Sequence, residues 1–133
     1  MTPQTLVAHL NAYEWNYPRG RDAQHNVIRW KTLVSADRVP TEAIIMGILE
    51  VPPGAKMNTH RHVQPEVYFV YEGSGEVYID EVIHPVNAGS VVFVCGNSLH
   101  GVRNRTGETL KLMWVFADHS FAEVKYRGEP VDF

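Results

Sequence analysis

Short segments in which apolar and polar positions alternate follow one another along most of the chain, from about residue 27 onward. Side chains of a β-strand point alternately to opposite faces, so this alternation is typical of strands that bury one face. Turn-forming residues separate the segments, as in Pro52-Pro53-Gly54 and Gly73-Ser74-Gly75. The predicted strands are Val27–Val34, Ala43–Val51, Met57–His62, Val67–Glu72, Glu76–Ile79, Val82–Val86, Ser90–Val94, Gly101–Asn104 and Lys111–Phe116. Many short strands at near-regular spacing indicate an all-β sandwich or barrel.

The segment before the strands predicts a short N-terminal helix or arm. Thr2-Pro3 can cap a helix in which Leu6, Val7 and Leu10 share one face, and a frayed terminus is the alternative. The chain has 133 residues and shows no linker, repeat or helix–strand alternation. We therefore expect a single domain over residues 1–133, with a barrel core at about residues 27–126.

Composition and charge narrow the classes of function. The formal net charge is −3, and Lys and Arg are scattered, which argues against nucleic acid or an anionic membrane as the main partner. No apolar run reaches the roughly 18 residues that span a bilayer, and the N-terminus has no secretion-signal pattern. The one cysteine, Cys95, cannot form an internal disulfide, which fits a cytoplasmic location, and we expect it to be a buried structural thiol.

Four residues carry the candidate chemistry. His60 and His62 are two positions apart in a predicted strand, so both imidazoles should point to the same face. Glu66 can re-enter beside them after the bend at Pro65, and His100 can approach from a later strand. Three imidazoles and one carboxylate favour one divalent transition metal, Fe, Mn, Ni, Co, Cu or Zn, over Ca or Mg.

The spacing of these residues resembles the two sequence motifs of the cupin superfamily. The first motif is matched at Gly54, His60, His62, Glu66 and Gly73. The second is matched at Gly89, His100 and Asn104, with Cys95 where the family usually has Pro and Asn97 where it has Gly. Asn tolerates the left-handed conformation that such a turn needs. The resemblance implies the cupin double-stranded β-helix, a jelly-roll barrel, in a compact form without an inserted lobe.

Strand periodicity predicts where further side chains point. Tyr68 lies two residues after Glu66 and should face the barrel interior, whereas Tyr71 should point outward. On the last strand Leu112, Trp114 and Phe116 share one face and Met113 and Val115 the other, and the sequence leaves open which set lines a cavity. The remaining histidines are expected to be solvated: His9, His25, His84 and His119.

Among cupins, the chain is most similar to the short cupin-type dimethylsulfoniopropionate lyases. The residues that carry this resemblance are Trp30-Lys31 with Leu33, His60 and His62 with Pro65-Glu66-Val67-Tyr68, Gly96-Asn97 with His100, Trp114-Val115-Phe116, Phe121, Glu123-Val124 and Tyr126. In that family the metal ligands correspond to His60, His62, Glu66 and His100. The base that removes the proton next to the substrate carboxylate corresponds to Tyr68, with Tyr126 as an accessory. The resemblance thus implies β-elimination on a small organic carboxylate.

Two other readings stay open. A non-haem metal dioxygenase, or another metal-cupin reaction on a small molecule, would use the same ligand set, and a ligand-binding cupin would carry out no catalysis. Open barrels leave edge strands that need covering, so we also expect a homodimer, formed either by the edge strand Val27–Val34 or by the flat face of the barrel.

Overall fold

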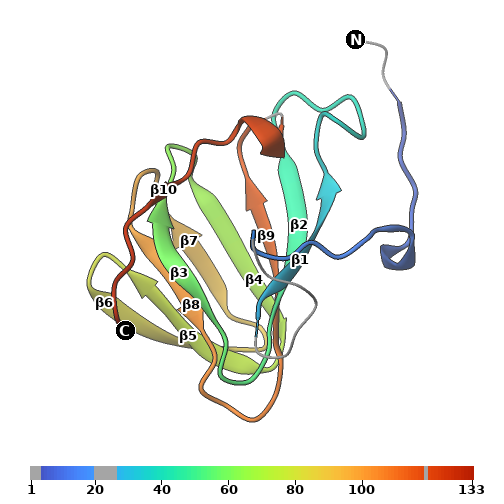
Figure 1. The fold of residues 1–133 in the computed structure, drawn as a ribbon. Helices are drawn as coiled ribbons and strands as arrows, with labels where there is room; N and C mark the ends of the chain where they lie inside the picture. Colours follow the sequence, from blue (N-terminus) through green and yellow to red (C-terminus); the bar gives the residue numbers. More distant parts are fainter. Residues whose placement is uncertain (1–3, 20–26, 119) are drawn as a thin grey trace.

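The computed structural model describes residues 4–19, 27–118 and 120–133, and in this part of the chain it is almost entirely β (Figure 1). In chain order the elements are η1 (Leu10–Ala12), β1 (Arg29–Val34), β2 (Ile45–Val51), β3 (Lys56–Arg61), β4 (Glu66–Glu72), β5 (Ser74–Ile79), β6 (Val82–Asn87), β7 (Val91–Val94), β8 (His100–Arg103), β9 (Leu110–Phe116), η2 (Phe121–Glu123) and β10 (Arg127–Gly128). All nine predicted strands are present, with ends that differ from the prediction by at most two residues.

The strands form two antiparallel sheets that enclose the core. The first sheet has the order β1-β2-β9-β4-β7 and the second the order β10-β3-β8-β5-β6. From β2 onward the chain crosses repeatedly from one sheet to the other, so strands that are neighbours in sequence mostly lie in different sheets. This arrangement is the jelly roll, and the predicted all-β fold class is confirmed.

Alternation along the strands places the core between the sheets. Every second residue of β9 is buried, from Leu110 to Phe116, and the same holds for β4 from Glu66 to Val70. The buried apolar residues form one cluster that spans both sheets. The period-2 pattern in the sequence therefore corresponds to the inner and outer faces of the barrel.

Two local predictions need correction. In the described part of the N-terminal segment, from residue 4, the only helical element is one 3-10 turn, Leu10–Ala12, and Leu6 and Val7 are exposed, while the predicted cap Thr2-Pro3 lies outside the described residues. So short a segment cannot sustain an isolated helix unless an apolar face is buried. Cys95 is exposed, because Val92 and Val94 point inward on β7 and the odd-numbered positions face outward. The described residues include no helix that is long and apolar enough to cross a membrane.

Two turns of the described chain place residues other than glycine in the left-handed region of the backbone. Asp80 and Glu81 have φ values of 43° and 74°, so the β5–β6 hairpin uses a tight two-residue turn without glycine. Asp80 compensates by exchanging hydrogen bonds with the backbone of Leu99, at 2.8 and 2.9 Å. Asn97 has a φ of 65°, as predicted for the position where Asn replaces Gly.

Candidate metal centre

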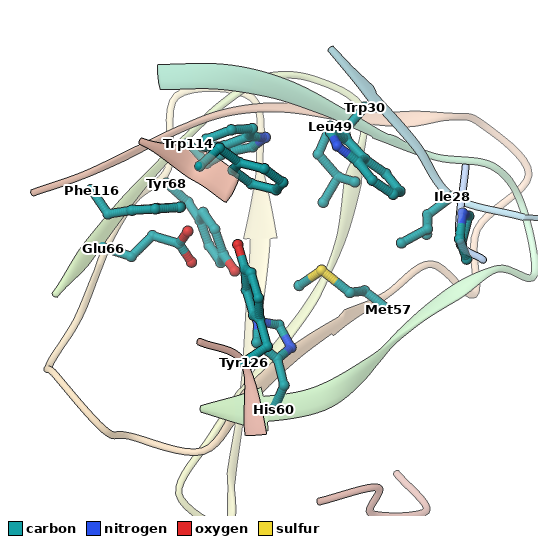
Figure 2. A pocket seen from close by; sticks show the side chains of 12 residues that line it. Ile28, Trp30, Leu49, Met57, His60, Glu66, Tyr68, Trp114, Phe116 and Tyr126 are labelled. Carbon is teal, nitrogen blue, oxygen red and sulfur yellow. The ribbon is translucent and has the colours of Figure 1, made fainter. Parts of the chain in front are cut away.

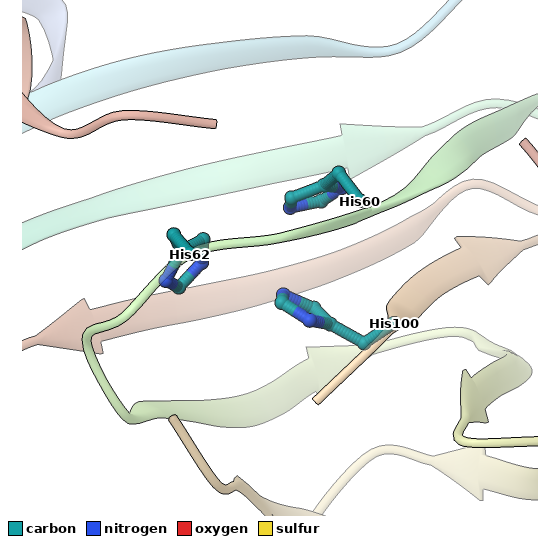
Figure 3. A group of neighbouring side chains, drawn as sticks. All are labelled: His60, His62 and His100. Atoms are coloured by element: carbon teal, nitrogen blue, oxygen red, sulfur yellow. The ribbon is translucent and has the colours of Figure 1, made fainter. Parts of the chain in front are cut away.

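Three histidines converge at one end of the barrel (Figure 3). His60 lies on β3, His62 directly follows that strand, and His100 begins β8, where it pairs with His60 in the antiparallel register. One ring nitrogen from each lies within 4.8 Å of the others. The strand pairing and the two-residue spacing thus bring together side chains that are 40 positions apart in sequence.

The backbone fixes the orientation of each imidazole. The Nδ1 atoms of His60, His62 and His100 lie 3.0, 2.9 and 2.8 Å from the carbonyl oxygens of Asn58, Gln64 and Ser98. A carbonyl can only accept, so each Nδ1 carries the proton and donates it, and each Nε2 retains its lone pair. Hydrogen bonding of the outer ring nitrogen in this way is the usual support of a metal-binding histidine.

The inward ring nitrogens lack protein donors. Nε2 of His62 is buried and has no hydrogen-bond partner in the described structure. Nε2 of His100 faces Oε1 of Glu66 at 3.2 Å, and Nε2 of His62 lies 3.9 Å from the same oxygen. Two lone pairs facing each other at these distances call for a cation between them, so the residues present fit a divalent metal.

Burial keeps the imidazoles in the form that binds metal. Removal from water, followed by the electrostatic interaction with the neighbouring His100, lowers the pKa of His60 to about 4. Burial also lowers the pKa of His62, although the charge of Glu66 opposes the shift. His60 and His62 are therefore neutral near pH 7, as an imidazole must be to bind a metal.

A close contact between two loops positions His62 relative to His100. The loop after β3 and the turn before β8 touch at Gly96, where any β-carbon would overlap the carbonyl oxygen of Val63. The next residue, Asn97, donates its backbone N–H to the carbonyl of His62 at 2.8 Å. The pair Gly96-Asn97 is thus required by the approach of the two loops that carry the histidines.

An apolar cavity of about 330 Å³ opens beside the histidines (Figure 2). Its lining residues are Pro18, Ile28, Trp30, Leu49, Met57, His60, Glu66, Tyr68, Trp114, Phe116, Phe121 and Tyr126. The lining shows which face of β9 points inward. Trp114 and Phe116 face the cavity, and Met113 and Val115 lie on the opposite face. The described lining residues include neither Lys nor Arg, and the ionisable groups of this lining besides the two tyrosines are Glu66 and His60.

Two phenols point toward the carboxylate of Glu66 (Figure 2). Burial, then the charge of Glu66 and a hydrogen bond to it, hold the pKa of Tyr68 well above its usual range. Burial and the same charge also raise the pKa of Tyr126. Tyr126 packs against His60 and His62 at ring-centroid distances of 5.4 and 5.3 Å. Without a cation, both hydroxyls are therefore neutral donors.

The structure brings together every residue selected from the sequence for the site. His62, Glu66, Tyr68 and His100 are at most 5% exposed, and Tyr71 is 42% exposed on the outer face, as its parity predicts. Whether the four candidate ligands bind a metal remains a prediction. His9 and His84 are exposed as expected, and His25 and His119 lie outside the described residues.

Sequence reasoning missed the short C-terminal strand and the residues that complete the cavity wall. β10 pairs with β3 directly at His60 and Arg61, and it follows the segment that carries Phe121 and Tyr126. A strand of two residues is too short to show an alternation of apolar and polar positions, so no sequence pattern predicted it. Trp30 was noted only for the resemblance, although its apolar side chain on a strand next to β2 could have suggested a cavity position.

Comparison with known proteins agrees with this fold. The model of the cupin domain family matches residues 47–116, just over half of the chain, and the protein belongs to that family. Dimethylsulfoniopropionate lyase DddW of Ruegeria pomeroyi is 36% identical over 108 residues, which cover 81% of this chain and 70% of that protein.

One further curated relative and one solved structure are similar to this chain. The 5-nitrosalicylic acid 1,2-dioxygenase of a Bradyrhizobium species is 28% identical over 78 residues, which cover 59% of this chain and 37% of that enzyme. The structure of the polyketide cyclase RemF from Streptomyces resistomycificus matches with a TM-score of 0.77 and 16% identity, over 97% of this chain and 88% of that one. The last similarity is one of fold alone. Both curated relatives are enzymes, which supports an enzymatic role for this chain.

Proposed function

We propose that this protein is a metal-dependent lyase that cleaves dimethylsulfoniopropionate, or a closely similar sulfonium carboxylate, to acrylate and dimethyl sulfide. The observation that carries the proposal is the convergence of three imidazole Nε2 atoms and the Glu66 carboxylate at the end of an apolar cavity that also holds two phenols. The similarity to a dimethylsulfoniopropionate lyase over most of the chain supports it.

In this proposal His60, His62, Glu66 and His100 hold one divalent transition metal. When bound there, the metal would supply Lewis acidity toward the substrate carboxylate and would favour ionisation of nearby phenols. The Nδ1 hydrogen bonds to backbone carbonyls hold the three imidazoles in place before the metal arrives. The protein therefore needs little rearrangement on loading.

The cavity suits a small carboxylate with a cationic, methylated tail. Aromatic rings of Trp30, Trp114, Phe116, Phe121 and Tyr126 form much of its wall. Their negative faces attract a sulfonium or other soft cation, worth about 0.5–2 kcal/mol per well-placed ring. A substrate with a second carboxylate or a phosphate would find no Lys or Arg among the described residues of this lining, which disfavours its binding.

The proposed reaction is an elimination without redox change. Tyr68, ionised to the phenolate, would act as the base: it takes the proton from the carbon next to the carboxylate and becomes a neutral phenol. The electrons of that C–H bond form the carbon–carbon double bond, and the C–S bond breaks with its electron pair going to sulfur. Tyr126, on the opposite wall, is an accessory that orients the substrate or shares the proton. Tyr68 is only 2% exposed, which favours transfer of the proton to this fixed group, whereas Tyr126 is 45% exposed.

A dioxygenase is the second candidate, because the second curated relative has that activity and the same donor set can hold a redox-active metal. Anaerobic incubation of metal-loaded protein with dimethylsulfoniopropionate separates the two. The lyase should release dimethyl sulfide at the same rate with and without oxygen. Turnover that requires oxygen would contradict the lyase and favour the dioxygenase, and absence of turnover with the metal bound would favour ligand binding without catalysis.

Two tyrosines on one strand provide a matched test of the base. Tyr68→Phe removes the hydroxyl that points into the cavity, and Tyr71→Phe removes one on the outer face of the same strand. Tyr68→Phe should lower kcat by about 10²–10⁴ with the metal retained, and Tyr71→Phe should leave kcat unchanged. Equal rates for wild type and Tyr68→Phe would refute the role of Tyr68 while leaving the metal centre in place.

A cytoplasmic location and a homodimeric assembly also belong to the proposal. The lone cysteine supports the first. The exposed apolar side chains on the outside of the first sheet support the second.

A further inference from the structure

The C-terminal segment crosses from one sheet to the other beside the cavity. It follows β9 in the first sheet, passes through η2 and then forms β10, which pairs with β3 in the second sheet (Figure 1). Residues 120–131 of this segment are here called the C-terminal strap. The strap supplies two lining residues of the cavity, Phe121 and Tyr126. Its course therefore decides where these two aromatic side chains lie relative to the candidate metal centre.

Tyr126 depends on the strap for its position. Its side chain is 45% exposed, and its hydroxyl makes no hydrogen bond to another described residue. Its ring contacts His60, His62 and Phe121 at centroid distances of 5.4, 5.3 and 6.0 Å. Ring contacts allow a wider range of geometries than a hydrogen bond does. The backbone on either side of Tyr126 must therefore hold its oxygen in the direction of Glu66.

A buried hydroxyl on the second sheet fixes the strap after Tyr126. Thr59 on β3 is 1% exposed. Its Oγ1 donates to the carbonyl oxygen of Glu129 at 2.5 Å and accepts the backbone N–H of Val131 at 2.8 Å. The carbonyl of Thr59 also accepts the N–H of Glu129 at 3.2 Å. One threonine side chain thus satisfies two backbone groups that lie shortly beyond Tyr126.

A second buried hydroxyl fixes the strap before Tyr126. Ser35 directly follows β1 in the first sheet and is 0% exposed. Its Oγ accepts the backbone N–H of Phe121 at 3.0 Å. The carbonyl of Ser35 accepts the N–H groups of Arg38 and Val39 at 2.9 and 3.0 Å, so the turn after β1 does not require the hydroxyl. The side chain of Ser35 therefore serves the strap and not its own turn.

We infer that Ser35 and Thr59 are positioning residues: their hydroxyls hold the strap at both ends and thereby place Phe121 and Tyr126 in the cavity wall. The inference rests on the proposed lyase function, in which Tyr126 orients the substrate or shares the proton. Neither Ser35 nor Thr59 is among the lining residues, so each acts through the strap. A misplacement of about 1 Å in an active site is worth about 10²-fold in rate, so loose anchoring should be measurable.

Thr59→Val tests the anchor beyond Tyr126, because valine has nearly the shape of threonine and lacks the hydroxyl. It should lower kcat by about 10-fold or more with the metal retained, and Thr59→Ser, which keeps the hydroxyl, should restore most of the rate. In the Tyr126→Phe background, Thr59→Val should change kcat by less than about 2-fold, because the group that it positions is already gone. Independent losses that multiply, or a wild-type kcat in Tyr126→Phe, would overturn the inference.

Ser35→Ala tests the anchor before Tyr126. It leaves the N–H of Phe121 without its acceptor, and the ring of Phe121 is part of the wall that contacts the cationic tail in the proposed function. KM should therefore rise by about 3- to 10-fold, with a smaller change in kcat. A fall in kcat at constant KM would contradict the link between Ser35 and Phe121.

Trypsin gives a readout that does not require activity. Lys125 and Arg127 are exposed cleavage sites within the strap, and cleavage there requires the strap to detach from the barrel. In the full chain, with or without metal, Thr59→Val should be cut at these sites about 10-fold faster than wild type, since two hydrogen bonds are lost. The matched control is Thr32→Val, at a threonine of β1 that is 6% exposed, and it should be cut at the wild-type rate.

Melting curves show which variants remain folded. If Thr59→Val does not fold, Ser35→Ala decides the question by the same cleavage assay, because Ser35 lies outside β3. Equal cleavage of wild type and the anchor variants, or equal acceleration by Thr32→Val, would overturn the inference. An inactive wild type would instead refute the proposed function, and the cleavage rates would still decide whether the two hydroxyls hold the strap.

Discussion

The burial of His60 predicts that the metal-free protein loses stability on mild acidification. In the folded chain the pKa of His60 is lowered to about 4, from an ordinary value of 6.5. The unfolded chain therefore binds a proton from about pH 6.5 downward, whereas the folded chain excludes it until about pH 4. Stability should accordingly fall as the pH drops through this window and level off below it. The lowered pKa of His62 adds a contribution of the same sign.

The size of the effect follows from the shift. Across the whole window His60 accounts for on the order of 3 kcal/mol, and between pH 7 and pH 5 for about 2 kcal/mol of the free energy of unfolding. Urea unfolding of chelator-treated protein at several pH values measures it. The control is His60→Gln, which keeps a polar side chain but cannot titrate in this range. Carboxylates elsewhere affect both proteins alike, so the difference between the two curves isolates the histidine.

The result that would refute this reasoning is a flat difference. If wild type and His60→Gln lose stability in parallel from pH 7 to pH 5, then His60 is not desolvated as its position implies. The same experiment on metal-loaded wild type gives a further check. Bound metal competes with protons for Nε2, so the loaded protein should keep its stability to lower pH than the metal-free one.

Three further predictions concern metal binding and the residues that support the site. Metal at 100 times its dissociation constant should stabilise wild type by about 2.7 kcal/mol in thermal or urea unfolding, and His62→Ala should show little of this gain; equal gains would contradict the ligand assignment. Gly47→Ala should cost about 1–3 kcal/mol and raise KM, because its β-carbon would overlap the Trp114 ring and the Lys31 carbonyl; unchanged stability and KM would contradict that contact. Asn104→Ala should cost about 2–4 kcal/mol in urea unfolding, since its buried amide bridges two carbonyls and a neighbouring turn; a loss below about 0.5 kcal/mol would show that the amide is replaceable.

The sequence predicted the fold and the assembly of the site for one physical reason. Strand periodicity is strict, so the spacing of His60 and His62 and the parity of Tyr68 and Tyr71 translate directly into faces of the barrel. The motif glycines and Asn97 mark turns whose backbone geometry few other residues allow. Where period 2 applied, the prediction agreed with the structure.

Predictions were weak where side chains alone decide the structure. The two-residue strand β10 and the cavity position of Phe121 depend on contacts with β3 and β9 that no local pattern encodes. On β9 the alternation divides the residues between two faces, but only the position of the opposite sheet shows which face points inward. Cys95 was assigned to the core from residue type, although the alternation of β7 would have placed it outside.

The acceptors that orient the three histidines are main-chain carbonyls, and this has a consequence for how the site withstands mutation. Asn58, Gln64 and Ser98 contribute only their backbone oxygens to the imidazoles. Replacing any of these three side chains leaves the acceptor in place, provided the local backbone is kept. Many metal centres depend on a second ring of side chains, each of which can be lost by a single codon change. In this protein backbone carbonyls take the place of those side chains. The side chains around the histidines can therefore change without altering the orientation of the imidazoles.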